Sequence, residues 1–313
     1  MWHLYLPIAG SSVNTLLVFG MGGLVGLLSG IFGVGGGFLM TPLLIMVGIP
    51  PTVAAASDSN QIVGASTSGT LAHYRMGNVD FKMGILLLIG GVIGGTVGVE
   101  IIKILRELGN ADFLIKITYV IMLGFVGSYM FIESLQSLRK KEEFEEWIEK
   151  KKEKKEKESL YARIVKALPW QVRFEKSGVQ FSILLPLLLG TFVGILAAIM
   201  GVGGGFIMVP VMVYLLRMPM HVVVGTSLFQ ILFTCVNVTI MQARTNHTVD
   251  FILAILLLLG STIGAQIGAR ISRRLKADQL KILLASIVLL VMIKMLLSLL
   301  LPPDIMIAYK GGH

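Results

Sequence analysis

Eight apolar runs of about 20 residues each divide this chain, and they restrict its fold more than any other feature. They cover residues 13–31, 53–72, 81–102, 113–132, 179–200, 222–242, 251–269 and 280–301. As helix, such a run spans about 30 Å of hydrocarbon, and helices satisfy their own backbone hydrogen bonds in lipid. With 55% hydrophobic and only 14% charged residues, the chain is predicted to be an all-α integral membrane protein, a polytopic helical bundle.

A glycine-rich decamer occurs twice, and each copy leads into an apolar run too short to cross a bilayer. The copies read GVGGGFLMTP at 33–42 and GVGGGFIMVP at 201–210. Glycine costs about 1 kcal/mol relative to alanine inside a helix, so the decamers predict helix breaks. The short runs after them, 38–47 and 206–216, predict half-helices. Because lipid offers no hydrogen bonds to broken backbone, we expect both decamers inside the bundle.

The duplication extends beyond the decamers and predicts two homologous halves. The tripeptide VDF occurs at 79–81 and at 249–251, and each copy precedes three glycines spaced four residues apart. Glycines at this spacing share one helix face and allow two helices to approach closely in lipid. The predicted units are a first transmembrane repeat at 1–135, a charged connector at 136–177, a second repeat at 178–302 and a C-terminal tail at 303–313.

Positive charge is concentrated in the connector and predicts the membrane orientation. Between Arg139 and Lys176 there are thirteen Lys or Arg and nine acidic residues, a net +4 of the chain's +9. By the positive-inside rule, the connector and the basic loop at 270–281 are cytoplasmic, in the cell (cytoplasmic) membrane. Topology explains this basic segment, so no nucleic-acid partner is expected. The connector either docks a partner or only tethers the halves.

The same rule makes the two halves inverted copies, with the loop at 73–82 inside and the N-terminus outside. In that arrangement Lys103, Arg106 and Lys116 face outward. The alternative is a parallel arrangement with four crossings in each half.

The order of these motifs resembles that of the TauE/SafE family of membrane transporters. The resemblance rests on the decamer, a Pro-containing break, a segment bearing Ser, Asn and Gln, a polar loop ending in VDF and a glycine-laddered span, repeated in both halves. It implies a transporter, commonly an exporter, of sulfite, sulfonates such as sulfoacetate or related small anions. The second copy lacks counterparts of Gly30 and of the Thr41 hydroxyl, so the halves cannot make identical contacts.

The glycine breaks themselves predict an anion site. A half-helix that begins at a break presents free backbone N–H groups and the positive end of its dipole, about half a unit charge. In transporters built from repeats, such ends meet near the membrane midplane. The alternative is that the glycines serve only close helix crossing. The substrate-binding candidates are Gly35, Gly36, Gly37, Phe38, Gly203, Gly204, Gly205 and Phe206.

Polar side chains in the run at 53–72, and in its counterpart in the second half, add further candidates. Polar groups at membrane depth serve a cavity or bond to one another, and hydroxyls and amides donate hydrogen bonds to oxyanions. The alternative is a helix start that Thr52 caps. These further substrate-binding candidates are Ser59, Asn60, Gln61, Thr226, Ser227 and Gln230.

Three charged residues have predicted roles around this site. Asp58 has no acidic counterpart in the second half; protonated by desolvation it would couple proton and anion movement, or it caps a helix start at the membrane border. Arg75 and Arg244 occupy near-equivalent positions, one residue out of step. They either attract anions to a vestibule or anchor the spans at the lipid headgroups.

The sequence therefore predicts a secondary transporter that works by alternating access around a midplane site, with a small anion, the lipid bilayer and, as a hypothesis, a proton as partners. It predicts no enzyme, because the spans hold no paired acids, metal cluster or nucleophile with a base. No cofactor or metal is expected, and the oligomeric state is left open. The alternatives are a passive anion channel and an uptake permease for another small organic or inorganic anion.

Overall fold

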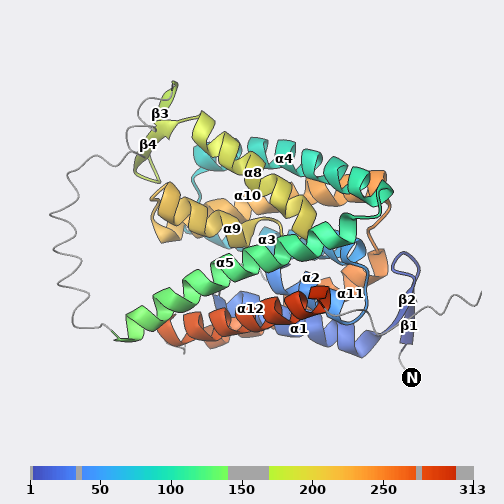
Figure 1. Ribbon diagram of the computed structural model, residues 1–313. Coiled ribbons are helices and arrows are strands. Elements are labelled where there is room, and N and C mark those ends of the chain that lie inside the picture. Colours follow the sequence, from blue (N-terminus) through green and yellow to red (C-terminus); the bar gives the residue numbers. More distant parts are fainter. Residues whose placement is uncertain (1–2, 33–36, 140–168, 273–276, 301–313) are drawn as a thin grey trace, which may run out of the picture.

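The computed structural model describes residues 3–32, 37–139, 169–272 and 277–300, most of them in helices (Figure 1). The first half contains β1 (His3–Leu6), β2 (Ser11–Asn14), α1 (Thr15–Phe32), α2 (Gly37–Met46), α3 (Pro51–Arg75), α4 (Phe81–Glu107) and α5 (Ala111–Arg139). The second half contains β3 (Gln171–Phe174), β4 (Val179–Ser182), α8 (Leu184–Met200), α9 (Gly205–Pro210), the π-helix η2 (Val211–Leu215), α10 (Met220–Met241), the π-helix η3 (Gln242–Asn246), α11 (Phe251–Ser272) and α12 (Ala277–Leu300). The predicted all-α polytopic fold is confirmed.

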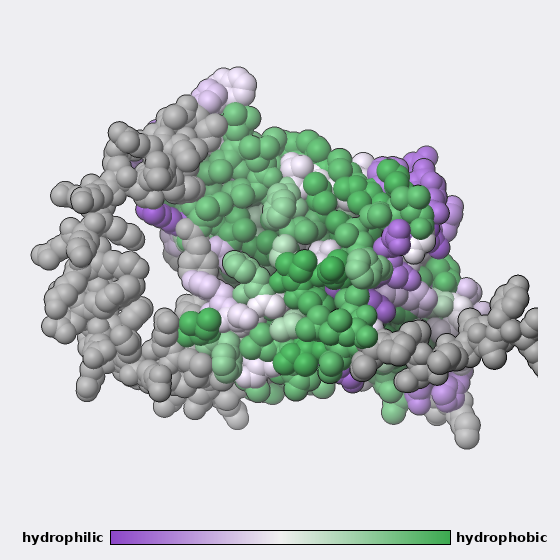
Figure 2. Space-filling model, viewed as in Figure 1, coloured by the Kyte–Doolittle hydropathy of each residue, from purple (hydrophilic) through white to green (hydrophobic). Residues whose placement is uncertain are grey.

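A helix occurs at each of the eight apolar runs, and a short helix begins within each decamer, at Gly37 and at Gly205. Among the described residues, α4, α5, α10 and α11 are long and apolar enough to cross a membrane. Figure 2 shows hydrophobic residues covering most of the visible face, with hydrophilic residues gathered toward the ends of the bundle. This distribution is the one expected of a bundle surrounded by lipid.

The prediction of one continuous span at 179–200 is wrong at its start. Residues 179–182 form β4, which pairs antiparallel with β3, and the helix begins only at Leu184. The turn is made by Gly178, whose φ is +67°. Phe174 and Phe181 are buried with their ring centroids 5.2 Å apart, so these apolar side chains pack a hairpin rather than face lipid. Val13 likewise belongs to β2, ahead of α1.

Each long helix packs mainly against a helix of the other half. The closest pairs are α1 with α11, α4 with α8, α3 with α10, and α5 with α12. The glycine ladders lie in these seams: a Cβ at Gly94 would be 2.0 Å from the Thr191 carbonyl oxygen, and one at Gly264 would be 2.0 Å from the Gly23 carbonyl oxygen. The predicted role of the ladders in close helix crossing is confirmed.

The two VDF aspartates tie each half to the hairpin of the other half. Asp80 caps α4 and accepts hydrogen bonds from the Ser177 hydroxyl (2.5 Å) and N–H (3.2 Å), while Asp250 accepts from the Ile8 N–H (3.2 Å). Figure 1 shows the hairpins β1–β2 and β3–β4 at opposite ends of the bundle. Equivalent loops, 76–80 and 247–250, therefore lie at opposite ends too, as inverted repeats require.

Two π-helices in the second half coincide with one-residue insertions. Equivalent residues are 168 positions apart at Gly37 and Gly205, 169 at Gln61 and Gln230, and 170 at Asp80 and Asp250. The offset rises from 168 to 169 between Gly205 and Gln230, where η2 lies. It rises from 169 to 170 between Gln230 and Asp250, where η3 lies. A π-turn closes over five residues instead of four and so absorbs one extra residue. This explains why Arg75 and Arg244 are one residue out of step.

Candidate functional site

The second decamer is a helix break, as predicted. After α8 ends at Met200, Gly201, Gly203 and Gly204 have φ values of +73°, +69° and +78°, a conformation that disfavours side chains. Gly205 then begins α9. In the first decamer Gly35 and Gly36 lie outside the described residues, and Gly37 begins α2.

The two half-helices begin beside one another inside the bundle. The rings of Phe38 and Phe206 stack with centroids 4.4 Å apart and an interplanar angle of 13°, and each side chain is 2% exposed. A Cβ at Gly37 would lie 3.4 Å from the Cα of Val202, within the opposite break. The structure thus brings Gly37 and Phe38 together with Gly203 to Phe206, as the sequence predicts.

The break in the second half leaves buried backbone N–H groups without partners. The Gly201 N–H donates to the Ala197 carbonyl at 2.8 Å, and the Ile207 N–H donates to the Gly204 carbonyl at 3.1 Å. The intervening N–H groups of residues 203–206 have no acceptor among the described residues. Buried N–H groups are nearly always paired, so this cluster is available to a ligand with acceptor oxygens.

Gln61 and Gln230 are the two side-chain candidates with unmet hydrogen-bonding capacity. They occupy equivalent positions on α3 and α10, are 3% and 0% exposed, and each has an Oε1 without a partner among the described residues. The Gln230 Nε2 donates to the Thr234 Oγ1 at 2.9 Å within α10. Ile231, next to Gln230, lies against Gly203 of the break. A terminal amide can turn to offer its NH₂ or its oxygen, so this pair suits a polar ligand.

The remaining polar candidates lie elsewhere in the same two helices. The hydroxyls of Ser59 and Ser227 donate to carbonyls of their own helices, those of Ala55 at 3.2 Å and Val224 at 3.1 Å. Asn60 is half-buried on α3.

Thr226 serves the loop before α4, because its Oγ1 accepts the Asp80 N–H at 3.0 Å. Ser57 does the same for the other half, accepting the Asp250 N–H at 3.2 Å. Sequence reasoning missed Ser57. Its equivalence to Thr226 becomes visible once the one-residue insertion is placed.

Asp58 lies in the interior of the protein, well inside α3. It is 0% exposed, and its Oδ2 accepts the Thr41 hydroxyl at 2.9 Å, while its Oδ1 has no partner among the described residues. Because α3 begins at Pro51, the alternative in which Asp58 caps the helix start is wrong. Thr52 is also inside α3, where its N–H donates to the Asp112 Oδ1 at 3.3 Å, so Thr52 is not the cap.

Tyr119 on α5 is a central residue that sequence reasoning missed. It is 0% exposed, and its hydroxyl donates to the main-chain carbonyl of Met200, the last residue before the second break. It also lies near Thr41 and Asp58. A tyrosine within an apolar span was the available signal, because a buried hydroxyl needs a partner.

Arg75 and Arg244 lie at the ends of α3 and η3, away from the breaks. Both side chains are exposed, and within the described residues neither forms an ion pair. Their places fit either predicted role, a vestibule or a headgroup anchor. Glu100 and Lys103 form the i,i+3 pair that their spacing favours, at 3.9 Å.

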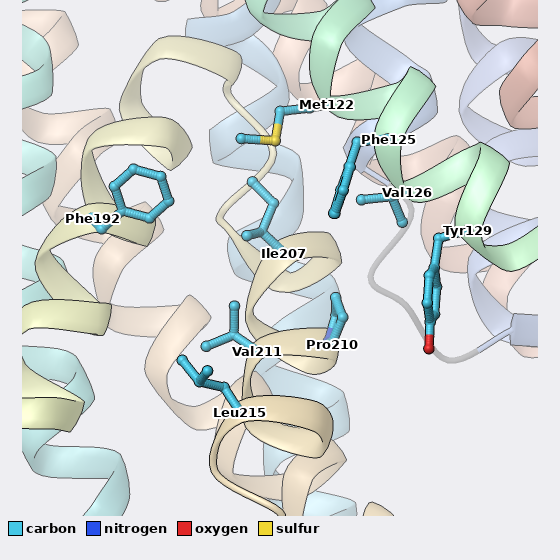
Figure 3. Close-up of a pocket in the computed structure, with 9 residues that line it drawn as sticks. All are labelled: Met122, Phe125, Val126, Tyr129, Phe192, Ile207, Pro210, Val211 and Leu215. Carbon is cyan, nitrogen blue, oxygen red and sulfur yellow. The ribbon is translucent and has the colours of Figure 1, made fainter. Parts of the chain in front are cut away.

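The two half-helices pack differently despite their similar sequences. α2 packs mainly against α3 and also against α1 and α12, whereas α9 and η2 pack mainly against α10 and make fewer contacts with α8 and α5, the equivalent neighbours, among the described residues. Figure 3 shows the cavity of about 490 Å³ between α5, α8 and the α9–η2 segment. The cavity opens to the surface of the bundle, since Phe125 is 74% exposed and Phe192 is 54% exposed. Its lining residues are Met122, Phe125, Val126, Tyr129, Phe192, Ile207, Pro210, Val211 and Leu215.

Comparisons with known proteins agree with this architecture. Residues 18–295 match the family model described as Sulfite exporter TauE/SafE. The chain is 27% identical over 286 residues to the "Probable membrane transporter protein YjnA" of Bacillus subtilis (strain 168), covering 91% of this chain and 100% of that protein. It is 30% identical over 114 residues to "Sulfite exporter TauE/SafE family protein 2" of Arabidopsis thaliana, covering 36% and 25% of the two chains. No solved structure matches.

Proposed function

We propose that this chain, which belongs to the Sulfite exporter TauE/SafE family, is a secondary transporter of a small sulfur-containing anion such as sulfite or sulfoacetate, with export the expected direction. The family is one of membrane transporters, not of enzymes, and the apolar helices make the chain a multi-pass membrane protein. One observation carries the proposal. Among the described residues, the buried N–H groups at 203–206 have no acceptor at the place where the two half-helices meet.

The anion would bind between the two breaks. The N–H groups of the second break, with the equivalent groups of residues 35–38 in the first, would surround its oxygens. The Gln61 and Gln230 amides, whose oxygens have no partner among the described residues, would turn so that their NH₂ groups donate to the anion from α3 and α10. Such a site holds an anion with backbone dipoles rather than with a buried Lys or Arg, so release costs less than from an ion pair in low dielectric.

Alternating access is the mechanism that the asymmetry between the half-helices supports. α2 is packed against its neighbours, while α9 and η2 stand beside an open cavity. If the two half-helices exchanged these states, the cavity beside α9 and η2 would close and an equivalent cavity would open beside α2. The stacked Phe38 and Phe206 rings close the contact between the breaks, which favours a transporter over a continuously open channel.

Replacing Gln61 or Gln230 by leucine tests the site. Because the Gln61 Oε1 has no partner among the described residues, we expect Gln61→Leu to keep the unfolding temperature of the wild type. Gln230→Leu also removes the hydrogen bond to Thr234 and should unfold at a somewhat lower temperature. Transport should fall roughly 10- to 100-fold, since hydrogen bonds to charged groups contribute about 1.5–3 kcal/mol. The measurement is uptake of labelled sulfite and sulfoacetate by liposomes containing the purified full-length protein.

Gln180→Leu, at an exposed position of β4, is the control and should transport like the wild type. Wild-type rates in Gln61→Leu and Gln230→Leu would remove both residues from the site. Wild-type liposomes that move neither anion would overturn the proposed substrate class.

Cysteine labelling tests the inverted arrangement and the placement of the connector (136–177) on the cytoplasmic side of the cell membrane. The chain has a single cysteine, Cys235, which is fully buried, so Cys235→Ala gives a background for single exposed cysteines. With a membrane-impermeant maleimide, we expect Arg75→Cys to label from the cytoplasm and Arg244→Cys from outside. Glu175→Cys should label from the same side as Arg75→Cys. The reason is that Lys176, next to Glu175, donates from its Nζ to the Gly77 carbonyl at 3.4 Å, close to Arg75 in the chain. Labelling of both arginine positions from one side would establish parallel repeats instead.

A further inference from the structure

Asp58, the buried acid of the first half, has no acidic counterpart at the equivalent position of the second half. Ser227 occupies the position equivalent to Asp58, and Val209 occupies that of Thr41. The second half nevertheless forms a half-helix, α9 continued by η2, and equivalent long helices. The second half therefore serves as an internal control, and it shows that this fold does not require the buried carboxyl.

Asp58 joins the elements that carry both breaks. The Asp58 cluster consists of Thr41 on α2, Asp58 on α3, Tyr119 on α5 and the main-chain carbonyl of Met200 at the end of α8. Thr41 belongs to the first half-helix, and Met200 is the residue before the second break. A change at Asp58 therefore acts directly on groups next to the proposed anion site.

No cation compensates the Asp58 carboxyl among the described residues. The ionisable groups that face it are Tyr119 from α5 and Cys235 from α10, neither of which is cationic. Asp250 is the acid whose N–H donates to Ser57, the residue next to Asp58. The Asp250 carboxylate accepts hydrogen bonds from the N–H groups of Ile8 and Leu253. An isolated buried carboxylate is costly, so in this closed arrangement Asp58 is stable when it carries a proton.

We propose that Asp58 binds the proton that is cotransported with the anion, an inference that rests on the proposed function. When Asp58 is protonated, the site is neutral, and the unpaired N–H groups can accept an anion. When Asp58 is ionised, its charge repels the anion at short range in low dielectric. Proton and anion therefore bind together and leave together, one proton per anion, so export is driven by a high internal anion concentration and opposed by an inward proton gradient.

The cluster suits a proton better than a metal cation. Hard metal cations need about six or more converging oxygen ligands. Here the Thr41 hydroxyl already donates to Asp58 and the Tyr119 hydroxyl to Met200, which leaves only the Oδ1 without a partner in the part of the chain that the structure describes.

Proton movement can be measured directly in liposomes that contain the full-length protein and a trapped pH dye. Sulfoacetate is the probe, because both its acidic groups are ionised between pH 6 and 8, whereas sulfite takes up a proton near neutral pH. Adding sulfoacetate outside should acidify the interior. An acid-outside gradient should concentrate labelled sulfoacetate inside.

Asp58→Asn should lower both of these signals at least tenfold while labelled sulfoacetate still exchanges for internal unlabelled sulfoacetate. Asp58→Ser is a second test. It introduces the side chain that occupies the equivalent position 227 in the second half, where the same kind of helix forms around it. Glu175→Gln, an exposed acid in the β3–β4 turn, is the control and should behave like the wild type.

Each outcome decides between the two proposals. Sulfoacetate flux without acidification in the wild type, or gradient-driven accumulation that survives in both Asp58 variants, overturns the coupling and leaves the transport proposal intact. Loss of exchange in both variants also overturns the coupling and places Asp58 in anion binding instead. Absence of sulfoacetate flux in the wild type overturns the proposed function and the coupling with it.

Discussion

Gly94→Ala is expected to prevent stable folding, whereas Gly20→Ala is expected to be tolerated. A Cβ at Gly94 would lie 2.0 Å from the carbonyl oxygen and 2.7 Å from the carbonyl carbon of Thr191 on α8. These are backbone atoms, so relief requires α4 and α8 to separate along a seam that both halves share. Overpacking costs typically 1–3 kcal/mol and occasionally more, and we expect about 3 kcal/mol or more here.

Gly20 is the matched control for this experiment. It lies in α1, and a Cβ there would meet nothing within 4 Å. Alanine at a free helical site is favoured over glycine by up to about 1 kcal/mol, so the unfolding temperature should stay or rise. Size-exclusion chromatography and thermal unfolding in detergent measure both variants. Equal stability of the two variants would show that α4 and α8 do not pack as described.

Asp80→Ala is expected to lower stability by about 2–4 kcal/mol, combining loss of a helix cap with an unpaired buried donor. Asp80 is 3% exposed and caps α4 by accepting the Met83 N–H at 3.2 Å. It also accepts the hydroxyl of Ser177, which is itself 3% exposed. The substitution therefore frees the start of α4 and leaves a buried hydroxyl of the other half without its acceptor.

Thermal unfolding checks the Asp80 prediction against Glu175→Ala. Glu175 is exposed and only 3.8 Å from the Lys82 Nζ, and surface ion pairs of this kind contribute about 0–1 kcal/mol. Similar unfolding temperatures for the two variants would contradict the proposed tie between the halves. Asp250→Ala should repeat the Asp80 result, because Asp250 binds Ile8 of the opposite hairpin and caps α11 through the Leu253 N–H.

Local sequence predicted the helices, the second break and the helix crossings because each has a short-range physical cause. Apolar length predicts a span, consecutive glycines predict the break, and glycines four apart predict a close seam. The hairpin β3–β4 escaped prediction although Val179 and Phe181 alternate with the polar Gln180 and Ser182, because a helix-length apolar run follows directly from Ile183. The strand conformation of residues 179–182 depends on pairing with β3 and on burial against Phe174.

The Asp58 cluster could not be predicted because its members come from four separate elements. Asp58 stood out in the sequence as an acid inside a span, but its contacts with Thr41 and Tyr119 exist only after α2, α3 and α5 have packed. The different packing of the half-helices also depends on their neighbours, since GVGGGFLMTP and GVGGGFIMVP carry nearly the same local information. The one-residue mismatch at Arg244 was visible in the sequence, but its absorption by a π-turn was not.

The exchange of partners between the halves bears on the origin of this architecture. Because α1 packs against α11 and α4 against α8, a single repeat expressed alone would lack a partner for every glycine-lined seam. A half-length ancestor could have formed the same seams only as a pair of oppositely inserted copies. In a single chain the two halves can differ, as they do at Asp58 and Ser227, whereas two identical subunits could not.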